Sequence, residues 1–363
     1  FILDLESDVV NLRDFTWKGR TTSEERLSQY FYEKLWEIPL FNRMELIAGF
    51  LIDEEETLRG ADMEEEEKEQ LIWRMNGMYE TMDLFTLYNR FLASTGREPL
   101  ELKDGMIRYE DVYPLLYLKI SLWKQKDKIE VKHLIIDEMQ DYSYLQYRIL
   151  AKMFSCPMTI LGDRMQTMGE TQVDVLSFLP GIFGKDLYRM ELSKSYRSTV
   201  EILELAAAVS GEKTINCISR QGRKPMWYAA VDEEQMYTKL VRSLNEMTDV
   251  DTAAVLCLDQ EMAENVSEEL RERMPQMEIS LLTKDTKNFK PGLCVTTFYL
   301  AKGLEFDAVM IPFLEKYRTA FHRQALYINI TRALHVCSLF SSGDSKGSLG
   351  DELTEYRVEE GMA

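Results

Sequence analysis

The chain has 363 residues, of which 45% are hydrophobic and 29% charged, a composition typical of a folded protein with two or three domains. Its formal net charge of −19 disfavours general attraction to nucleic acid, because such binding rests on neutralising phosphates. No apolar run reaches the roughly 18 residues of a membrane span, and the five scattered cysteines fit neither a disulfide framework nor a zinc site.

Residues 1–105 are predicted to be mostly helical and strongly acidic. They include 24 acidic and 12 basic residues, so they carry −12 of the net charge. Thr22 and Glu25 have the spacing of a capping box at the start of a helix, and Gly60 is expected to end a later one. Residues 61–96 are predicted to form one long helix or two. An acidic region of this kind is usually a solvated surface, and a basic protein partner is the alternative.

The stretch from residue 106 to residue 186 is predicted to be part of a first α/β domain. A helix is expected over residues 109–124 and a buried strand over 131–137. A second helix follows over 143–154, and a second strand over 157–163.

Strands and helices alternate regularly from residue 187 to residue 350. Strand-like runs such as "TAAVLCL" and "LCVTTF" are separated by amphipathic stretches of helical length. This alternation predicts an α/β domain with a parallel, doubly wound sheet. Residues 351–363 are expected to form a fraying tail.

The stretch "HLIIDEMQDYS", residues 133–143, places acids directly after a buried strand. Asp137 and Glu138 follow the strand, and Asp141 comes soon after. Carboxylates at the carboxyl end of a parallel strand can hold Mg²⁺ and polarise an attacking water. The pair could equally cap a helix. The usual partner of such a site, the phosphate loop G-x-x-x-x-G-K-[ST], does not occur in the chain.

Four further motifs follow in order along the chain. They are "TILGDRMQ" with Gly162, Asp163 and Gln166, "LSKSYRSTVEI" with Tyr196 and Arg197, "VTTFYLAKGLEFDAV" with Thr297, Lys302, Gly303 and Glu305, and "LYINITRALHV" with Thr331 and Arg332. With the acidic stretch, they make the chain resemble the superfamily 1 helicases of the UvrD/Rep type, whose motifs II to VI they match in order.

The resemblance implies two RecA-like P-loop NTPase folds with parallel doubly wound sheets. The first would be incomplete over residues 106–186, the second would span residues 187–350, and residues 1–105 would be a helical insertion or arm. It also implies ATP as the substrate and Mg²⁺ as the metal, held by Asp137 through water. A lone arginine on a helix is usually a solvated partner in an ion pair, whereas in these motifs Arg197 and Arg332 would act as arginine fingers on the γ-phosphate.

The remaining roles are also implied by the resemblance. Glu138 would activate water and Gln166 would sense the γ-phosphate. The residues expected to contact the nucleotide are Asp163, Tyr196 on the adenine, Gly303, and Glu305 on the sugar. Thr297 and Lys302 would contact the nucleic-acid backbone.

Several departures from the UvrD pattern point to one branch of the superfamily. The segment after Gln166 has no aromatic residue for base stacking, Tyr299 replaces the usual histidine, and only about a hundred residues separate Arg197 from Val295. These features resemble the HelD / helicase IV branch, whose ATPases bind bacterial RNA polymerase and help to free it from nucleic acid. Residues 1–105 would then correspond to the helical arms that contact the polymerase.

Three hypotheses about function follow. The first is the C-terminal part of an ATP-driven motor that acts on RNA polymerase, and the second is a DNA-translocating repair helicase. The third is a binding module that does not hydrolyse nucleotide. Because the chain starts at Phe1 in the middle of a pattern, we interpret it as part of a longer protein with the phosphate loop upstream. Alone it is expected to be inactive as an ATPase, and we expect a cytoplasmic monomer with no membrane partner.

Overall fold

A computed structural model describes the chain except residues 125–129, 164–165, 168–173, 193, 212–215, 218–219, 248–249, 287–291 and 359–363. The chain divides into two compact units. The first consists of Phe1–Asp137, Tyr142–Leu161 and Val175–Leu187, and the second of Glu138–Asp141, Gly162–Asp174 and Tyr188–Ala363. No described helix has the length and apolar character needed to cross a membrane.

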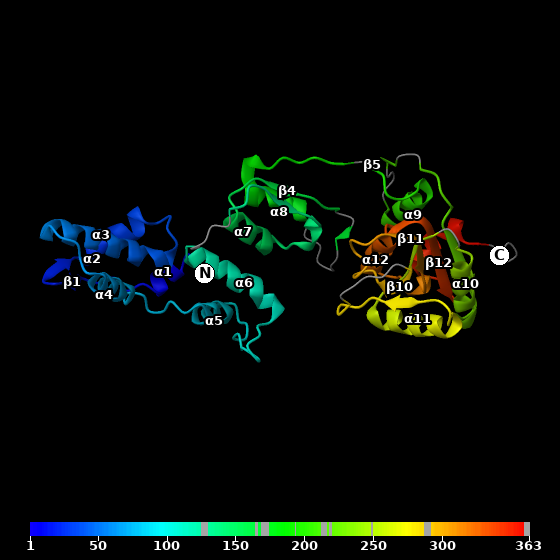
Figure 1. The fold of residues 1–363 in the computed structure, drawn as a ribbon, viewed down its shortest axis with the longest axis horizontal. Coiled ribbons are helices and arrows are strands. Elements are labelled where there is room, and N and C mark those ends of the chain that lie inside the picture. The colour runs from blue at the N-terminus through cyan, green and yellow to red at the C-terminus, as the bar shows by residue number, and fades with distance from the viewer. Residues whose placement is uncertain are drawn as a thin grey trace. The chain divides into compact units, whose positions relative to one another are not determined.

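The first unit begins with a helical region that has its own core (Figure 1). Its elements are α1 (Leu5–Asp8), a hairpin of β1 (Phe15–Trp17) and β2 (Arg20–Thr22), α2 (Glu24–Ser28), a π-helix (Gln29–Lys34), α3 (Arg43–Arg59), α4 (Glu65–Asn76) and α5 (Leu84–Ser94). The expected capping box at Thr22 and Glu25 is wrong by one residue, because Ser23 is the N-cap and accepts from the Arg26 amide at 3.4 Å. Residues 61–96 form two helices, since Asp83 caps α5.

Helix α6 (Tyr109–Leu122) packs on two sides within the first unit. Leu115, Leu118 and Leu122 are buried in the same core as the helices of residues 1–94. On another side, the Tyr117 hydroxyl accepts a hydrogen bond from Arg148 of α7 (Tyr144–Met153) at 3.4 Å. The helical region and the α/β part of this unit therefore share α6.

The α/β part of the first unit is small. Its parallel strands are β3 (Leu134–Ile136) and β4 (Met158–Ile160), and they pack with α7 and α8 (Val175–Phe183). Ser143 and Gln146 form a complete capping box at the start of α7, which fixes where the chain resumes a helix after the acidic segment.

The second unit contains a six-stranded parallel sheet, which confirms the predicted α/β fold with a doubly wound sheet. The strand order is β7-β12-β11-β8-β10-β9. The strands are β7 (Met226–Ala230), β8 (Thr252–Cys257), β9 (Ile279–Leu281), β10 (Gly292–Thr297), β11 (Phe306–Ile311) and β12 (Ala333–Ser342), and a separate parallel pair is formed by β5 (Lys194–Ser195) and β6 (Asn216–Cys217).

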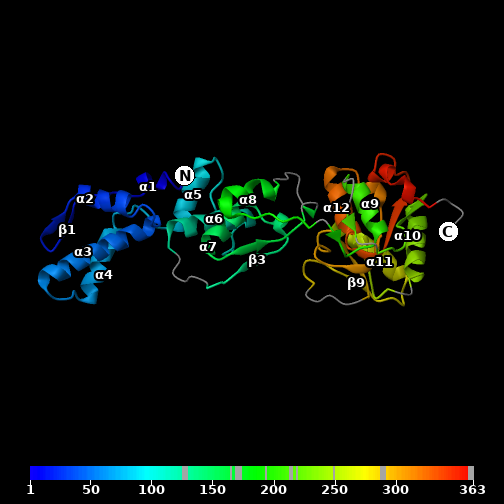
Figure 2. The same cartoon turned by 90° about the horizontal axis from the view of Figure 1, so that it is seen from above.

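Helices cover both faces of this sheet, as two views show (Figures 1 and 2). On one face, α9 (Val200–Ser210) and α12 (Ala320–Ile330) pack on Ala254 and Leu256 of β8. On the other face, α10 (Glu233–Asn245) and α11 (Gln260–Arg273) pack on Val255 and Cys257. Neighbouring side chains of a strand point to opposite faces, so every residue of a fully covered strand can be apolar.

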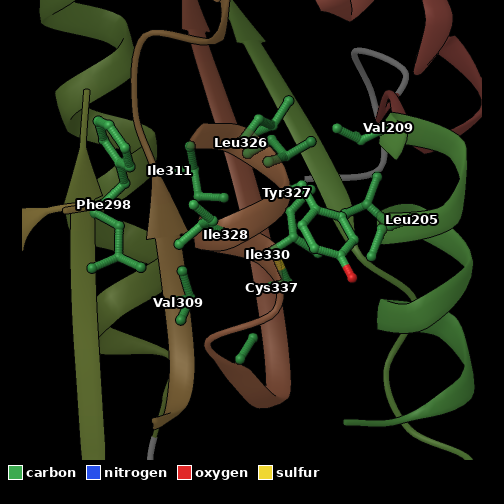
Figure 3. Packing of buried hydrophobic residues seen from close by; sticks show 14 of the residues in the cluster. Leu205, Val209, Phe298, Val309, Ile311, Leu326, Tyr327, Ile328, Ile330 and Cys337 are labelled. Atoms are coloured by element: carbon green, nitrogen blue, oxygen red, sulfur yellow. The ribbon is translucent and has the colours of Figure 1, made fainter. Parts of the chain in front are cut away.

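The core under α9 and α12 is closely packed (Figure 3). Leu205 and Val209 of α9 lie in one cluster with Val309 and Ile311 of β11 and with Tyr327 of α12. Residues 351–358, which we expected to fray, partly belong to this core.

Two residues near the C-terminus, Leu353 and Tyr356, contribute to this core. Both are buried in the cluster beneath α9, and the Val358 amide donates to the Trp227 carbonyl at 2.9 Å. The expectation of a fraying tail from residue 351 is therefore wrong for this segment, because its apolar side chains complete the core.

Candidate nucleotide and phosphate site

The acidic segment after β3 bends sharply at Glu138. Asp137 ends the part of the chain that belongs to the first unit, and Glu138 begins a short segment of the second unit. Glu138 has a φ of +52°, in the left-handed region that a residue with a side chain rarely adopts. A conformation of this kind costs about 1 kcal/mol or more and is found most often at functional sites.

Gln140, which the sequence analysis did not single out, links two of the predicted motifs. Its Nε2 donates to Glu138 Oε2 at 2.5 Å, and its Oε1 accepts from the Asp163 amide at 3.1 Å. Its place between Glu138 and Asp141 in the acidic stretch was the only feature of the sequence that could have identified it as a site residue. The link shows that the segments around residues 138 and 163 are held together by a buried side-chain amide.

Gly162 stands where these two segments approach each other. A Cβ atom at this position would lie 2.6 Å from the Met139 amide nitrogen and would also overlap the Met139 and Gln140 side chains. Real Cβ contacts are not this short, so only glycine fits without a shift of the backbone. The glycine of "TILGDRMQ" is thus explained by packing.

Gln166 and Arg332 come from two different motifs and are in direct contact. Arg332 Nη2 donates to Gln166 Oε1 at 3.0 Å, and Gln166 Nε2 donates to Asp163 Oδ2 at 3.0 Å. The Arg332 side chain is only 1% exposed, and its other donors bind the carbonyls of Leu304 at 3.4 Å and Ile328 at 3.3 Å. The guanidinium is therefore held in one place within the second unit.

The charges around Arg332 include most of the predicted catalytic groups. Burial lowers the pKa of the Arg332 guanidinium below its ordinary value, and the charge of Arg197 lowers it further. The carboxylates of Glu138, Glu305 and Asp163 act in the opposite direction. Two guanidinium groups and three acids thus lie close enough to influence one another, in a site where an added anion would offset the repulsion between the two arginines.

Arg197 and Glu305 form an ion pair, with side chains 41% and 39% exposed. Tyr196, beside Arg197, is 68% exposed, so its ring is accessible to a planar group. Gly303 has a φ of +80°, which glycine adopts without strain, in the turn that leads to Glu305.

Lys302 and Thr297, the two residues expected to contact nucleic acid, are largely buried. The Lys302 ammonium pairs with Asp141, lies 4.0 Å from Glu138 Oε2, and donates to the Gln166 carbonyl at 3.4 Å. Thr297 Oγ1 accepts from the Leu300 amide at 3.3 Å, which closes the turn after β10. Their contact with nucleic acid stays a prediction, and the structure places Lys302 among the acids.

Seven of the predicted site residues are brought together in the second unit by these contacts and charges, namely Glu138, Asp163, Gln166, Arg197, Lys302, Glu305 and Arg332. Tyr196 is next in sequence to Arg197. Asp137 lies in the first unit, directly after β3. Among the described residues, no group of three or more His, Cys, Asp or Glu side chains is arranged to hold a metal ion.

Comparison with known proteins gives limited similarity to helicases. No protein-family model matches the sequence. Over 137 residues, the chain is 28% identical to the ATP-dependent DNA helicase srs2 of Schizosaccharomyces pombe, a match that covers 36% of this chain and 14% of that protein. The chain thus spans a small part of this curated relative. The sequence similarity supports a relation to the helicase superfamily.

Two solved structures are also similar. The C-terminal domain of a possible DNA helicase from Lactobacillus plantarum is 27% identical, with a TM-score of 0.38, and the match covers 45% of this chain and 98% of that one. The S. cerevisiae protein dbp5, bound to nup159, gle1 and ADP, is 16% identical, with a TM-score of 0.39, and the match covers 69% of this chain and 64% of that one. Both scores are below 0.5, and the fold assignment rests on the strand order and register.

Proposed function

We propose that the chain is the C-terminal part of an ATP-driven superfamily 1 motor of the UvrD/Rep type, and that it acts on complexes of RNA polymerase with nucleic acid, as HelD-type proteins do. The observation that carries the ATPase part is the contact between Arg332 and Gln166, since it joins two motifs that the resemblance assigns to the γ-phosphate.

The charges of the second unit fit phosphoryl transfer. A transferring phosphoryl group spreads negative charge over its oxygens, and fixed cations stabilise it without reorganisation. Arg332 is already fixed by four acceptors, whereas Arg197 is 41% exposed and paired with Glu305. In this proposal, Arg332 gives a preorganised charge, and Arg197 exchanges its carboxylate partner for a phosphate oxygen.

The acids fit the water-activating and metal-binding roles. Mg²⁺ in such sites is held by one or two carboxylates together with substrate phosphates, so Asp137 suffices as its protein ligand in this proposal. The ion, when bound, neutralises charge on the β- and γ-phosphates. Glu138, in its strained conformation, would accept the proton of the attacking water, while the Gln140 amide fixes the carboxylate.

Hydrolysis also needs the cradle of a phosphate loop, and the chain has no G-x-x-x-x-G-K-[ST]. We therefore expect the purified chain to show no ATPase activity above background, with or without single-stranded DNA. Phosphate release at a saturating ATP concentration checks this. DNA-stimulated turnover by the chain alone would contradict the assignment of residues 138–332 as half of a site.

The proposed protein partner rests on the acidic helical region. Residues 1–105 carry a net charge of −12, which suits a basic protein surface better than a phosphate backbone. Deleting these residues would be a poor test, because it would expose Leu115, Leu118 and Leu122 of α6. Charge reversal at exposed positions leaves the core intact.

The test is binding to bacterial core RNA polymerase and to single-stranded DNA at about physiological salt. The variant Glu66→Lys/Glu69→Lys reverses two exposed charges on α4, and Glu261→Lys/Glu268→Lys makes the same change on α11 as a matched control. Polymerase binding that weakens only with the α4 variant supports the proposal. Equal effects of both variants, or no polymerase binding, would contradict it.

A DNA-translocating helicase is the second candidate, and the similarity to the srs2 helicase favours it. In that case the chain binds single-stranded DNA in a strongly salt-dependent way and does not bind the polymerase. The same experiment separates the two functions.

A further inference from the structure

A cavity of about 200 Å³ with a partly polar lining lies in the second unit, at the edge of the sheet where the parallel strands begin. His335, near the start of β12, forms part of its wall, and Val250 precedes β8. Thr199, Gly222 and Arg223 contribute the polar side. None of these residues belongs to the proposed nucleotide site.

Thr199, one of the residues that line the cavity, has a buried hydroxyl without a partner. The residue is 2% exposed, and in the described part of the chain its Oγ1 has no hydrogen-bond partner. Thr199 is the N-cap of α9, a helix of 11 residues, yet its side chain caps no amide. By contrast, the N-cap side chains of α10, α11 and α12 all accept a backbone hydrogen bond. A buried hydroxyl without a partner costs about 1–3 kcal/mol, so a ligand that accepts from it is favoured.

The chain segment next to Thr199 is held close to the start of α9. The Val200 amide donates to the Arg220 carbonyl at 3.0 Å, and the Gly222 amide donates to the Glu201 carboxylate at 2.9 Å. A Cβ atom at Gly222 would lie 2.8 Å from Thr199 Cβ and 3.0 Å from its Oγ1. Only glycine therefore permits this close approach.

One arginine lines the cavity and a second contacts its wall, although the chain as a whole carries −19. Arg223 lines it and forms no ion pair with any described residue. Arg220 Nη2 lies 3.0 Å from a ring nitrogen of His335. The first-turn amides of α9 add a partial positive charge.

Two carboxylates near the cavity, Glu201 and Asp307, are already engaged. Glu201 accepts from the Gly222 amide, as described above. Asp307, 3.8 Å from His335, accepts from the Thr252 amide and hydroxyl at 2.9 and 3.0 Å. Neither carboxylate bonds to Arg223, so the guanidinium fork is available to an anion.

We propose that this cavity binds a phosphate group, as the free ion or as a phosphate monoester. The Thr199 hydroxyl donates to one phosphate oxygen, Arg223 binds others through its fork, and the start of α9 adds its dipole. Arg220, whose Nη2 contacts His335 in the cavity wall, also donates to the Arg197 carbonyl at 3.2 Å, which links the cavity to the segment that carries the predicted arginine finger.

The test is calorimetric titration of the full chain with inorganic phosphate at constant ionic strength. Thr199→Val removes the hydroxyl and keeps the shape, and Arg223→Gln removes an exposed charge without touching the core. Each is expected to weaken phosphate binding about tenfold. Lys346→Gln, an exposed charge beyond the opposite end of β12, is the matched control and should bind like the wild type.

Arg332→Gln separates this cavity from the proposed nucleotide site. Phosphate binding that is retained in Arg332→Gln and weakened about tenfold in both Thr199→Val and Arg223→Gln supports the cavity. Titration with a nucleoside monophosphate and with a 5′-phosphorylated oligonucleotide then shows which carrier is preferred. Binding lost only in Arg332→Gln, or weakened equally in Lys346→Gln, would overturn the proposal, as would unchanged binding in Arg223→Gln with an unaltered unfolding midpoint.

Discussion

The Arg332 guanidinium donates a hydrogen bond to the Gln166 side-chain oxygen at 3.0 Å, although 166 positions separate the two residues in sequence. The bond is buried, and the remaining Arg332 donors bind backbone carbonyls. Because its charged donor is buried, this contact should be stronger than a surface ion pair.

We expect substitution of the two residues to be strongly coupled. Arg332→Met and Gln166→Met should each lower the free energy of unfolding by about 1–3 kcal/mol, because each leaves a buried polar group without its partner. The double variant should lose less unfolding free energy than the sum of the two single losses, by a coupling energy of about 1–2 kcal/mol. Unfolding in urea measures all three variants. The exposed pair Arg242 and Glu246, treated in the same way, should give less than about 0.5 kcal/mol. Additive effects at 332 and 166 would show that the bond contributes little.

Gly162→Ala should destabilise the second unit by about 1–3 kcal/mol, because the new methyl group overlaps the Met139 amide. Gly49→Ala is the matched control in the middle of α3. A Cβ there meets no atom within 4 Å, so the change should stabilise the protein by about 0.5–1 kcal/mol through helix propensity. Thermal unfolding of both variants checks the pair. A neutral effect at residue 162 would mean that the two segments can separate at no cost.

Glu138→Gly should be more stable than Glu138→Ala by about 1 kcal/mol, since glycine adopts a φ of +52° without a steric cost. Both variants lack the carboxylate that accepts from Gln140, so the difference between their unfolding free energies reports mainly the backbone conformation. If the two variants unfold at the same denaturant concentration, the residue is not strained in solution.

Asp307 should make the second unit sensitive to acid. Burial raises the pKa of its carboxyl group, but hydrogen bonds from Thr252 and Asp251 outweigh burial and leave the pKa below its ordinary value. Because the folded pKa lies below the unfolded one, the stabilisation is present above about pH 4 and is lost as the pH falls through the folded pKa.

Asp307→Asn should therefore cost about 1–3 kcal/mol at pH 7, and the difference from the wild type should shrink below about pH 4. Unfolding in urea across this pH range measures it. The variant Glu261→Gln, at an exposed position on α11, is the control. A constant penalty at all pH values would mean that packing, and not charge, is responsible.

The parallel sheet of the second unit could be predicted because its strands are apolar and its helices amphipathic over long, regular stretches. Local periodicity determines both, and "TAAVLCL" is an unbroken run since β8 is covered on two faces. The site was predicted less completely. Gln140 acts through a contact with Asp163, a residue distant in sequence, which no local pattern encodes.

Two local expectations failed for related reasons. The cap of α2 is Ser23 and not Thr22, because neighbouring hydroxyl residues compete and the preceding hairpin decides between them. Leu353 and Tyr356 are buried because the core beneath α9 has room for them, which a short, charged C-terminal sequence does not reveal.

Helix α6 limits how the helical region could be exchanged between related proteins by recombination. Its leucines complete the core of residues 1–94, and its Tyr117 contacts α7. An exchange of the helical region between related proteins would have to carry α6 with it, or replace three matching leucines at once. Recombination with a breakpoint near residue 105 would thus seldom give a folded chimera. A breakpoint after Trp123 would keep α6 with its core and would replace only its partner in the contact with α7.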